Sequence, residues 1–179
     1  MITIQNKRRK IENIQKEFPN AEIIDVTSKG NEPFVKFSPF YPIGGIPIPN
    51  SNEATSESVE GIWQGLKVFS NQDIDLSKFQ ITNMKGLKRT VRKYGTPLGH
   101  RNGIDGTELL DYISARKEIY VPTYNWVLEN RLDKEVQKLK VMHSHQDLVL
   151  LDYETNEEIE NGSKPLSHAS LIKKFILEG

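Results

Sequence analysis

Residues 37–49 constrain the fold more than any other stretch, because they cannot form a helix. They contain four prolines, two glycines and three aromatic residues, and proline both lacks an amide donor and clashes with the preceding helical turn. A disordered linker is normally poor in aromatic residues, so we expect an ordered loop. Ordered loops often carry binding residues, which makes Phe37, Phe40 and Tyr41 candidate substrate-binding residues. A loop that merely closes the core is the alternative.

The hydrophobic pattern on either side of this loop predicts an α+β fold. Helical spacing is present at 4–18, 55–69, 84–94, 107–139 and 165–177, with a break at Pro122. Short apolar or β-branched runs at 22–27 and 147–153 predict strands. No internal repeat or shift in composition divides the 179 residues. We therefore expect residues 1–179 to form a helix-rich single domain with a small sheet.

Composition excludes several classes of protein. The chain has 24 Lys+Arg and 24 Asp+Glu, a balance that argues against a purely electrostatic partner such as bulk nucleic acid or an anionic membrane. It has no cysteine, which excludes disulfides, zinc–thiolate sites and a cysteine nucleophile. No apolar run approaches the roughly 18 residues of a membrane span. The amino-terminal residues lack the apolar segment of a secretory signal, so we expect a cytoplasmic protein.

The expected helix at 55–69 carries polar side chains suited to catalysis. Its apolar residues form one broad face, and Glu60, Gln64 and Lys67 lie together on the flank of that face. Glu60 would act as a general acid or base, Lys67 as an electrophile or nucleophile, and Gln64 would orient the substrate. The alternative is a solvated Glu–Lys pair, which is common on helices. Gly61 and Gly65 leave a strip of bare backbone where a ligand or another helix can approach.

The same residues resemble the signature of the NADAR, or YbiA-like, N-glycosidase superfamily. That signature has an aromatic loop of the Phe-Ser-Asn-Phe type, followed by a helix of the form Glu-x-x-aromatic-Gln-x-x-Lys-(x)-Phe. The chain has Phe-Ser-Pro-Phe-Tyr-Pro from residue 37, and then Glu60, Trp63, Gln64 and Lys67 at the matching spacing. Beyond this signature the similarity is weaker. The family's Asp-x-x-Trp-Gly-x-Gly motif is absent, so the resemblance is to a divergent branch of the superfamily, which we expect to be phage-borne.

The resemblance implies an α+β, YbiA-like hydrolase that cleaves the bond between a base or amine and the ribose of a ribose phosphate or ADP-ribose conjugate. Glu60, Lys67 and Asp152 would be catalytic, and Trp63, Gln64, Trp126 and His168 would bind substrate. Carboxylates would stabilise an oxocarbenium-like transition state, or Lys67 would capture the opened sugar as a Schiff base. Neither route needs a metal or an organic cofactor, so we expect none of either.

Basic residues are concentrated between Asp75 and Asp105, where no acidic residue occurs. Five of them follow helical spacing on the expected helix 84–94, and Arg101 lies in the Gly-rich loop after it; the five are Lys85, Lys88, Arg89, Arg92 and Lys93. A cationic helix before such a loop suits phosphate groups, so Arg89, Arg92 and Arg101 are candidate substrate-binding residues. A solvated basic face and a nucleic-acid-binding surface are the alternatives.

Three readings of the function remain open at the level of sequence. The first is the N-glycosidase-like hydrolase, with a small phosphorylated ribosyl or ADP-ribosyl substrate, free or on nucleic acid. The second is a non-catalytic protein that binds an ADP-ribosylated or phosphorylated ligand at the same residues. The third is a nucleic-acid-binding protein that uses the basic residues.

His143, His145 and Asp147 have a spacing seen in metal sites, but exposed side chains explain it better, so we expect no metal site.

Overall fold

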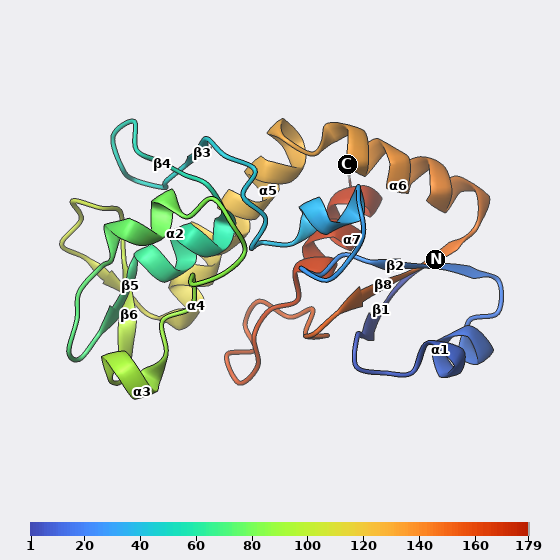
Figure 1. Ribbon diagram of the computed structural model, residues 1–179, viewed down its shortest axis with the longest axis horizontal. Helices are drawn as coiled ribbons and strands as arrows, with labels where there is room; N and C mark the ends of the chain where they lie inside the picture. The colour runs from blue at the N-terminus through green and yellow to red at the C-terminus, as the bar shows by residue number, and fades with distance from the viewer. Residues whose placement is uncertain (179) are drawn as a thin grey trace. The chain divides into compact units, whose positions relative to one another are not determined.

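The computed structural model describes residues 1–178 and has an α+β fold (Figure 1), which confirms the predicted fold class. The chain forms two compact units. Unit 1 contains Met1–Ser38 and the chain from Leu128 onward, and unit 2 contains Pro39–Val127. The boundary between them therefore falls inside the loop of residues 37–49, called the aromatic loop from here on, and, further on, inside helix α5 (Val121–Asn130).

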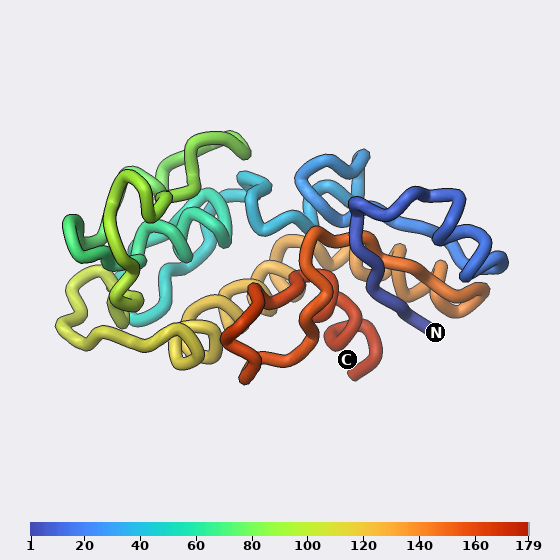
Figure 2. The backbone as a smooth tube through the Cα atoms, turned by 90° about the horizontal axis from the view of Figure 1, so that it is seen from below, coloured from blue at the N-terminus to red at the C-terminus, as the bar shows by residue number. Residues whose placement is uncertain are grey.

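Unit 1 is built on a parallel three-stranded sheet. Its strand order is β1-β8-β2, with β1 at Ile2–Asn6, β8 at Asp147–Asp152 and β2 at Ala21–Asp25. Figure 2 shows the blue amino-terminal segment beside the orange-red segment that contains β8. Residues 148–152 are all buried, as expected for a central parallel strand whose two faces are both covered. The predicted strand at 147–153 is confirmed.

Helices cover both faces of this sheet (Figure 1). On one face Ile14 of α1 (Ile11–Glu17) packs against Val149 and Leu151. Because strand side chains alternate between faces, Leu148 and Leu150 point to the other face. That face is covered by α6 (Asp133–His145) and α7 (His168–Glu178), which contact β8 and each other. A short 3-10 helix, η1 (Phe34–Phe37), precedes the boundary of the unit.

Unit 2 has two small antiparallel sheets and several short helices. The first sheet pairs β3 (Ile46–Pro47) with β4 (Thr55–Ser56), and the second has the order β5-β6-β7, with β5 at Lys67–Phe69, β6 at Pro97–Arg101 and β7 at Leu109–Leu110. The helical segments are α2 (Val59–Gly65), η2 (Leu76–Gln80), α3 (Val91–Tyr94), α4 (Tyr112–Ala115), the π-helical η3 (Arg116–Tyr120) and α5.

The bare backbone of α2 is covered by another element of the protein. A Cβ atom built on Gly65 would lie 2.2 Å from the Phe79 ring of η2, and one built on Gly61 would lie 2.8 Å from the Lys78 carbonyl oxygen. These distances are far below van der Waals contact, so both positions require glycine. Of the two uses that the sequence allowed for this strip, the structure shows the close approach of a helix.

Four predicted helices differ from the structure. At 107–139 the helical chain begins only at Tyr112, runs through Pro122 as η3 and α5, and breaks after Asn130 instead of at Pro122. The segment at 55–69 is helical only from Val59 to Gly65, because Ser58 caps its start and the chain then enters β5. The segment at 4–18 begins as strand β1, whose β-branched residues pair with β8. At 84–94 only Val91–Tyr94 is helical, so the five basic residues do not share one helical face. The proposed cationic helix was therefore wrong.

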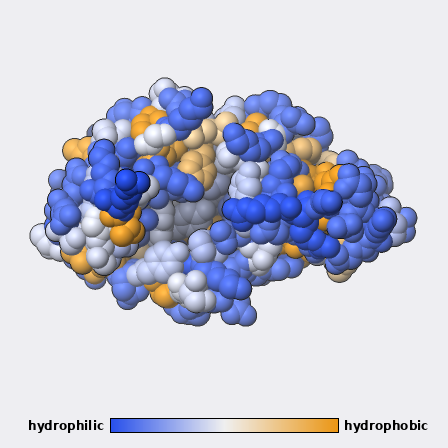
Figure 3. Space-filling model, turned by 60° about the horizontal axis from the view of Figure 1, so that its bottom comes forward, coloured by the Kyte–Doolittle hydropathy of each residue, from blue (hydrophilic) through white to orange (hydrophobic). Residues whose placement is uncertain are grey.

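No helix among the described residues is both long enough and apolar enough to cross a membrane. The face in Figure 3 is mostly hydrophilic, and its hydrophobic colour is confined to separate patches. Single exposed apolar side chains such as Val91 and Leu98 are normal for protein surfaces.

A candidate active site around Lys67

The side chains of Glu60 and Gln64 form a buried pair on α2. They lie one helical turn apart, and Gln64 Nε2 donates a 2.9 Å hydrogen bond to Glu60 Oε1. Gln64 Oε1 in turn accepts a hydrogen bond of 3.0 Å from the backbone amide of Arg89. The amide of Gln64 is therefore held in one orientation, and it fixes the position of the Glu60 carboxylate. The backbone amide of Glu60 also donates to the carbonyl of Pro39, which ties the aromatic loop to the start of α2.

Lys67 is the first residue of β5 and not a helical residue, because α2 ends two positions earlier. Its side chain is half-buried, and Nζ lies 5.6 Å from the centre of the Trp63 ring. Burial lowers the pKa of Lys67, Glu60 acts in the opposite direction, and the charges of Arg89 and Lys88 lower the pKa further. A larger fraction of Lys67 is consequently neutral, and a neutral amine is the form that attacks a carbonyl.

Arg89 is buried beneath these residues and bonds the backbone around them. Its Nη1 donates to the carbonyl oxygens of Gln64 and Lys67, and Nη2 donates to that of Asp73 at 2.7 Å. Its guanidinium also lies 4.8 Å from the centre of the Phe69 ring. The bond to the Gln64 carbonyl satisfies an acceptor left open at the end of α2, and the other two bonds tie the chain that follows it. Arg89 thus serves the backbone of the site, and the predicted phosphate contact has no support from this geometry.

His100 on β6 completes the group and was missed by the sequence analysis. It is the direct partner of Lys67 in the β5–β6 ladder, so both side chains project from the same face. Its ring centre lies 3.8 Å from that of Trp63. Burial lowers the pKa of His100 to about 3, and the charge of Lys67 contributes to the shift. The imidazole is therefore neutral near pH 7. No signal could have located it, since Gly95–Gly106 resembles a Gly-rich loop and hides strand β6.

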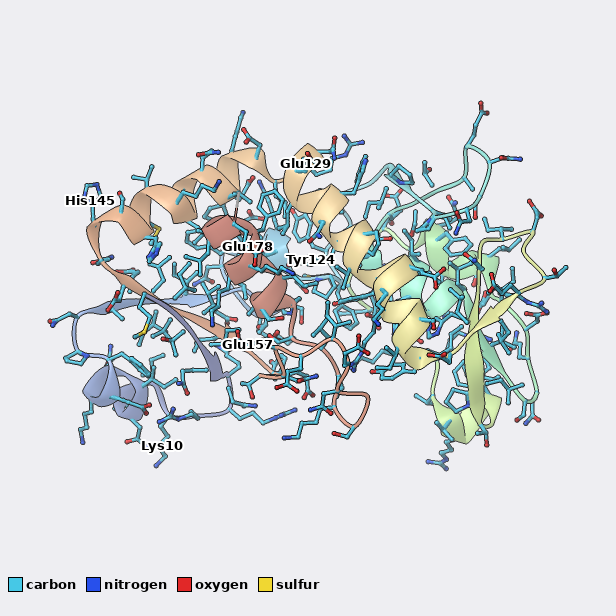
Figure 4. All side chains as sticks on the ribbon, turned by 180° about the vertical axis from the view of Figure 1, so that it is seen from behind. Lys10, Tyr124, Glu129, His145, Glu157 and Glu178 are labelled. Atoms are coloured by element: carbon cyan, nitrogen blue, oxygen red, sulfur yellow. The ribbon has the colours of Figure 1, made fainter. Side chains whose placement is uncertain are left out.

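Aromatic rings surround Trp63 on its remaining sides. Its ring contacts those of Tyr112 and Tyr120 at centre distances of 5.9 and 5.5 Å. Tyr120 stacks on Tyr124, which Figure 4 labels on α5. From the aromatic loop, Phe40 is half-buried and lies 5.5 Å from the Lys88 ammonium. Tyr41 and Trp126 are also half-buried within unit 2. Trp63 is thus the centre of an aromatic platform beside Lys67.

Two of the arginines predicted to bind substrate, Arg92 and Arg101, also belong to unit 2, but their side chains have no contact with this group among the described residues. Arg101 forms an ion pair of 2.7 Å with Asp73, which occupies its guanidinium. Arg92 is exposed on the short helix α3. The structure therefore groups Glu60, Trp63, Gln64 and Lys67 as predicted, and it gives Arg92 and Arg101 no part in that group.

Three of the predicted site residues belong to unit 1, where their side chains are buried and hold the fold: Phe37, Asp152 and His168. Phe37 is fully buried in η1. Asp152 Oδ2 lies 2.9 Å from His168 Nδ1 and accepts a 2.7 Å bond from the Ser167 hydroxyl. His168 Nε2 lies 2.9 Å from the carbonyl oxygen of Val26. Both nitrogens of His168 face acceptors, which favours the imidazolium form. This buried ion pair joins the end of β8 to the start of α7.

The charge states of this pair follow from its surroundings. Burial alone would raise the pKa of Asp152, but the charge and hydrogen bond of His168 and the bonds from Ser167 and Ala169 lower it to about 2. Burial opposes the charge on His168, but Asp152 and the Val26 carbonyl raise its pKa. Unit 1 also has ion pairs at its surface, such as that of Glu157, labelled in Figure 4, with Lys173 at 2.8 Å.

The described residues contain no group of three or more His, Asp or Glu side chains placed to hold a metal ion. The fold and the site thus define an α+β protein whose second unit holds a buried carboxylate–amide pair beside a lysine of lowered pKa. The chain belongs to a family of unknown function (DUF6939), whose model matches residues 6–172. No curated protein and no solved structure matches it.

Proposed function

We propose that the protein is a metal-independent, N-glycosidase-like hydrolase that acts on a ribose phosphate or ADP-ribose conjugate. The observation that carries the proposal is the partly buried Lys67 amine, whose pKa is lowered although Glu60 lies nearby. The resemblance of residues 37–69 to the NADAR signature supports the substrate class. We also propose the cytoplasm as the setting, with which a chain without cysteine is compatible.

The chemistry follows from two side chains. In its neutral form Lys67 attacks the anomeric carbon of the ribosyl group as the bond to the base or amine breaks, and the proton that the Lys67 nitrogen loses is taken up by the departing nitrogen. The sugar ring opens to a Schiff base on Lys67, and water then hydrolyses that Schiff base to release the sugar aldehyde and to restore the Lys67 amine. The Glu60 carboxylate stabilises the positive charge that develops at the anomeric carbon. In the alternative route Glu60 activates water directly and Lys67 only binds substrate.

The experiment measures release of ribose phosphate or ADP-ribose from a panel of N-ribosyl conjugates. We expect turnover by the wild type and a loss of at least about 100-fold in Glu60→Gln and in Lys67→Ala, as is typical when a general acid–base group is removed. Lys85→Ala is the matched control, because Lys85 is an exposed lysine of the same unit and is not among the charges that act on Lys67. Wild-type turnover in both site variants would reject the assignment.

Borohydride trapping separates the two routes. Reduction during turnover should attach the sugar to Lys67, and mass spectrometry of the peptide that contains residue 67 detects the adduct. An active enzyme with no adduct at Lys67 would support direct hydrolysis through Glu60. Tight binding of a conjugate without any release would instead support the reading as a non-catalytic binding protein.

A further inference from the structure

The loops that follow the neighbouring strands β1 and β8 leave the parallel sheet of unit 1 on opposite faces. The chain after β1 continues into α1, which packs on the face that carries Val149 and Leu151. The chain after β8 continues into α7, whose first turn bonds Asp152 on the other face (Figure 1). In open α/β sheets, ligands bind at the carboxyl ends of two strands whose connections diverge in this way. We call the carboxyl ends of β1 and β8 the switch point.

Hydrogen bonds join the two chains at the switch point. Asn6 Nδ2 donates a bond of 2.8 Å to the carbonyl oxygen of Tyr153, and Asn6 Oδ1 accepts one of 2.9 Å from the backbone amide of Arg8. The backbone amide of Lys7 also donates to the carbonyl oxygen of Asp152 at 2.8 Å. The residues that end the two strands therefore fix the backbone of Arg8 and Tyr153 at this edge of the sheet.

The Arg8 guanidinium forms no hydrogen bond and no ion pair within the part of the chain that the structure describes. The side chain is exposed, and its guanidinium carbon lies 5.2 Å from the centre of the Tyr153 ring. The basic residues on either side differ from it. Lys7 Nζ forms an ion pair of 2.6 Å with Asp25, and Arg9 forms one of the same length with a carboxylate of α1. Of three consecutive cations, the one over the ring is thus left for another partner.

The acidic groups near the switch point do not take this place. Asp152 pairs with His168 at 2.9 Å and accepts a bond of 3.3 Å from the backbone amide of Ala169, so the protein itself fills the amino-terminal end of α7. Glu154, in the loop after β8, forms no ion pair among residues 1–178. A carboxylate of the protein therefore does not compete for Arg8.

An arginine held in this way suits an oxyanion. Its planar guanidinium donates two parallel hydrogen bonds to a phosphate or a carboxylate group. Lys10, labelled in Figure 4, is exposed two residues further along and also has no carboxylate partner among the described residues. A phosphate monoester carries about two negative charges near pH 7, whereas a carboxylate carries one. Two unpaired cations in one short segment therefore favour the phosphate.

We propose that unit 1 binds a phosphate group of a small molecule at the switch point, with Arg8 as the residue that binds it and with Asn6 and Tyr153 as positioning residues. All of these residues belong to unit 1, whereas the Lys67 group belongs to unit 2. The proposal therefore adds a second site and does not depend on the proposed hydrolase activity.

Nuclear magnetic resonance titration of the ¹⁵N-labelled protein tests this site. The probes are inorganic phosphate, adenosine monophosphate and acetate. We expect the two phosphates to cause saturable shifts in the backbone amides of residues 6–9 and 153–154, and acetate to bind more weakly. Tighter binding of adenosine monophosphate than of inorganic phosphate assigns the site to a phosphorylated molecule, and equal binding assigns it to free phosphate. Shifts confined to unit 2, or no saturable shift with either phosphate, would overturn the proposal.

Substitutions at the exposed Arg8 side chain should leave the fold intact and change affinity. Arg8→Met should weaken phosphate binding by at least about tenfold, as for the loss of hydrogen bonds to a charged group, and Arg8→Lys should not restore it fully because it lacks the fork. Tyr153→Leu should weaken binding about two- to fivefold through loss of the cation–π contact. Lys16→Met, an exposed lysine of α1, is the matched control and should bind as the wild type does. Wild-type affinity in Arg8→Met, or acetate binding as tight as phosphate binding, would reject the site.

Discussion

His100 and His168 are both buried, yet their surroundings hold them in opposite charge states. His168 faces a carboxylate and a carbonyl oxygen, and its pKa is raised. His100 faces the ring of Trp63 and the lysine across the ladder, and its pKa falls to about 3. Burial disfavours the charged form of both rings, so the partner decides the outcome. At the scale of single residues, His168 therefore stabilises the fold as a charged partner of Asp152, whereas His100 is neutral.

The Asp152–His168 pair should stabilise unit 1 in a defined pH window. Asp152 contributes above its unfolded pKa of 3.8, and its contribution is lost as the pH falls through about 2. His168 contributes below its usual pKa of 6.5, and its contribution is lost as the pH rises through its raised folded value. We expect Asp152→Asn to lower the free energy of unfolding by about 3–5 kcal/mol at pH 5.5, as for other broken buried pairs. Urea unfolding measures this loss.

The loss should shrink as the pH rises past the folded pKa of His168, since the neutral ring no longer needs the carboxylate. The double variant Asp152→Asn/His168→Gln is the control, and its loss should be smaller than the sum of the two single losses because the residues are in contact. An Asp152→Asn penalty that is equal at pH 5.5 and pH 9 would contradict the ion pair.

Replacing His100 should stabilise the protein. Both ring nitrogens are buried, and neither has a hydrogen bond of good geometry among the described residues; the nearby Trp63 backbone only partly offsets the fall in the pKa of the ring. His100→Phe keeps a flat ring against Trp63 and removes both nitrogens, so we expect a gain of about 1 kcal/mol at pH 7. The gain should grow towards pH 5, because the unfolded histidine takes up a proton below pH 6.5 and the folded one does not until about pH 3. Chemical unfolding at both pH values checks this. A loss of stability at both would show that the nitrogens are engaged.

Sequence alone identified the residues of the site better than it identified their neighbours. Glu60, Trp63, Gln64 and Lys67 were found because they are close in sequence, so that their spacing is informative. The sequence predicts Arg89 at a phosphate, because it lies in a basic segment that precedes a Gly-rich loop. Its burial depends on carbonyls at positions 64, 67 and 73. No local pattern encodes such distant partners.

At the scale of elements, α2 and β5 show where periodicity misleads. Apolar residues at 59, 62, 63, 66 and 69 continue a helical pattern through a segment that is extended from Lys67 onward. The helix ends at Gly65, and residues 67–69 pair with β6 instead of continuing it. These are tertiary effects, and tertiary context overrides local propensity. The strand β8 was predicted correctly because its apolar run is buried on both faces and depends less on its exact neighbours.

Gly65→Ala should disrupt the packing of α2 on η2. The new methyl carbon would lie 2.2 Å from a ring carbon of Phe79, so either the ring or the helix must move. We expect a loss of about 1–3 kcal/mol in the free energy of unfolding, as for other overpacked cores, although alanine favours helix more than glycine does. Urea unfolding provides the value. Phe79→Leu in the Gly65→Ala background should recover part of the loss; a fully stable Gly65→Ala protein would show that the contact is not close in solution.

At the scale of the whole molecule, the sequence predicts one domain, whereas the structure contains two compact units. Whether the two units unfold together or separately tests that prediction. Trp63 and Trp126 are the only tryptophans, and both lie in unit 2. Tryptophan fluorescence therefore reports unit 2, while far-ultraviolet circular dichroism reports the whole chain. We expect the two signals to unfold together in urea, as a single two-state domain requires. Separate transitions would show that the units unfold independently.

The variant Val149→Pro sharpens this measurement. It removes a backbone donor from the central strand of the sheet in unit 1, a position where proline is not tolerated. In a single cooperative domain the variant should also lose the native fluorescence of unit 2. Native fluorescence with reduced circular dichroism would reject the single-domain prediction.

The strand order β1-β8-β2 has a consequence for how the chain is made. The two outer strands leave the ribosome first, and their shared neighbour is translated roughly 120 residues after the second of them, about 6–24 s later at ordinary rates of synthesis. During that interval the sheet of unit 1 lacks its central strand. The segments of β1 and β2, which are rich in β-branched residues, therefore have no strand to pair with. Unit 2, by contrast, is continuous in sequence and is complete before β8 emerges. The nascent chain is therefore most exposed to aggregation, and most dependent on chaperones, just before its last strand is added.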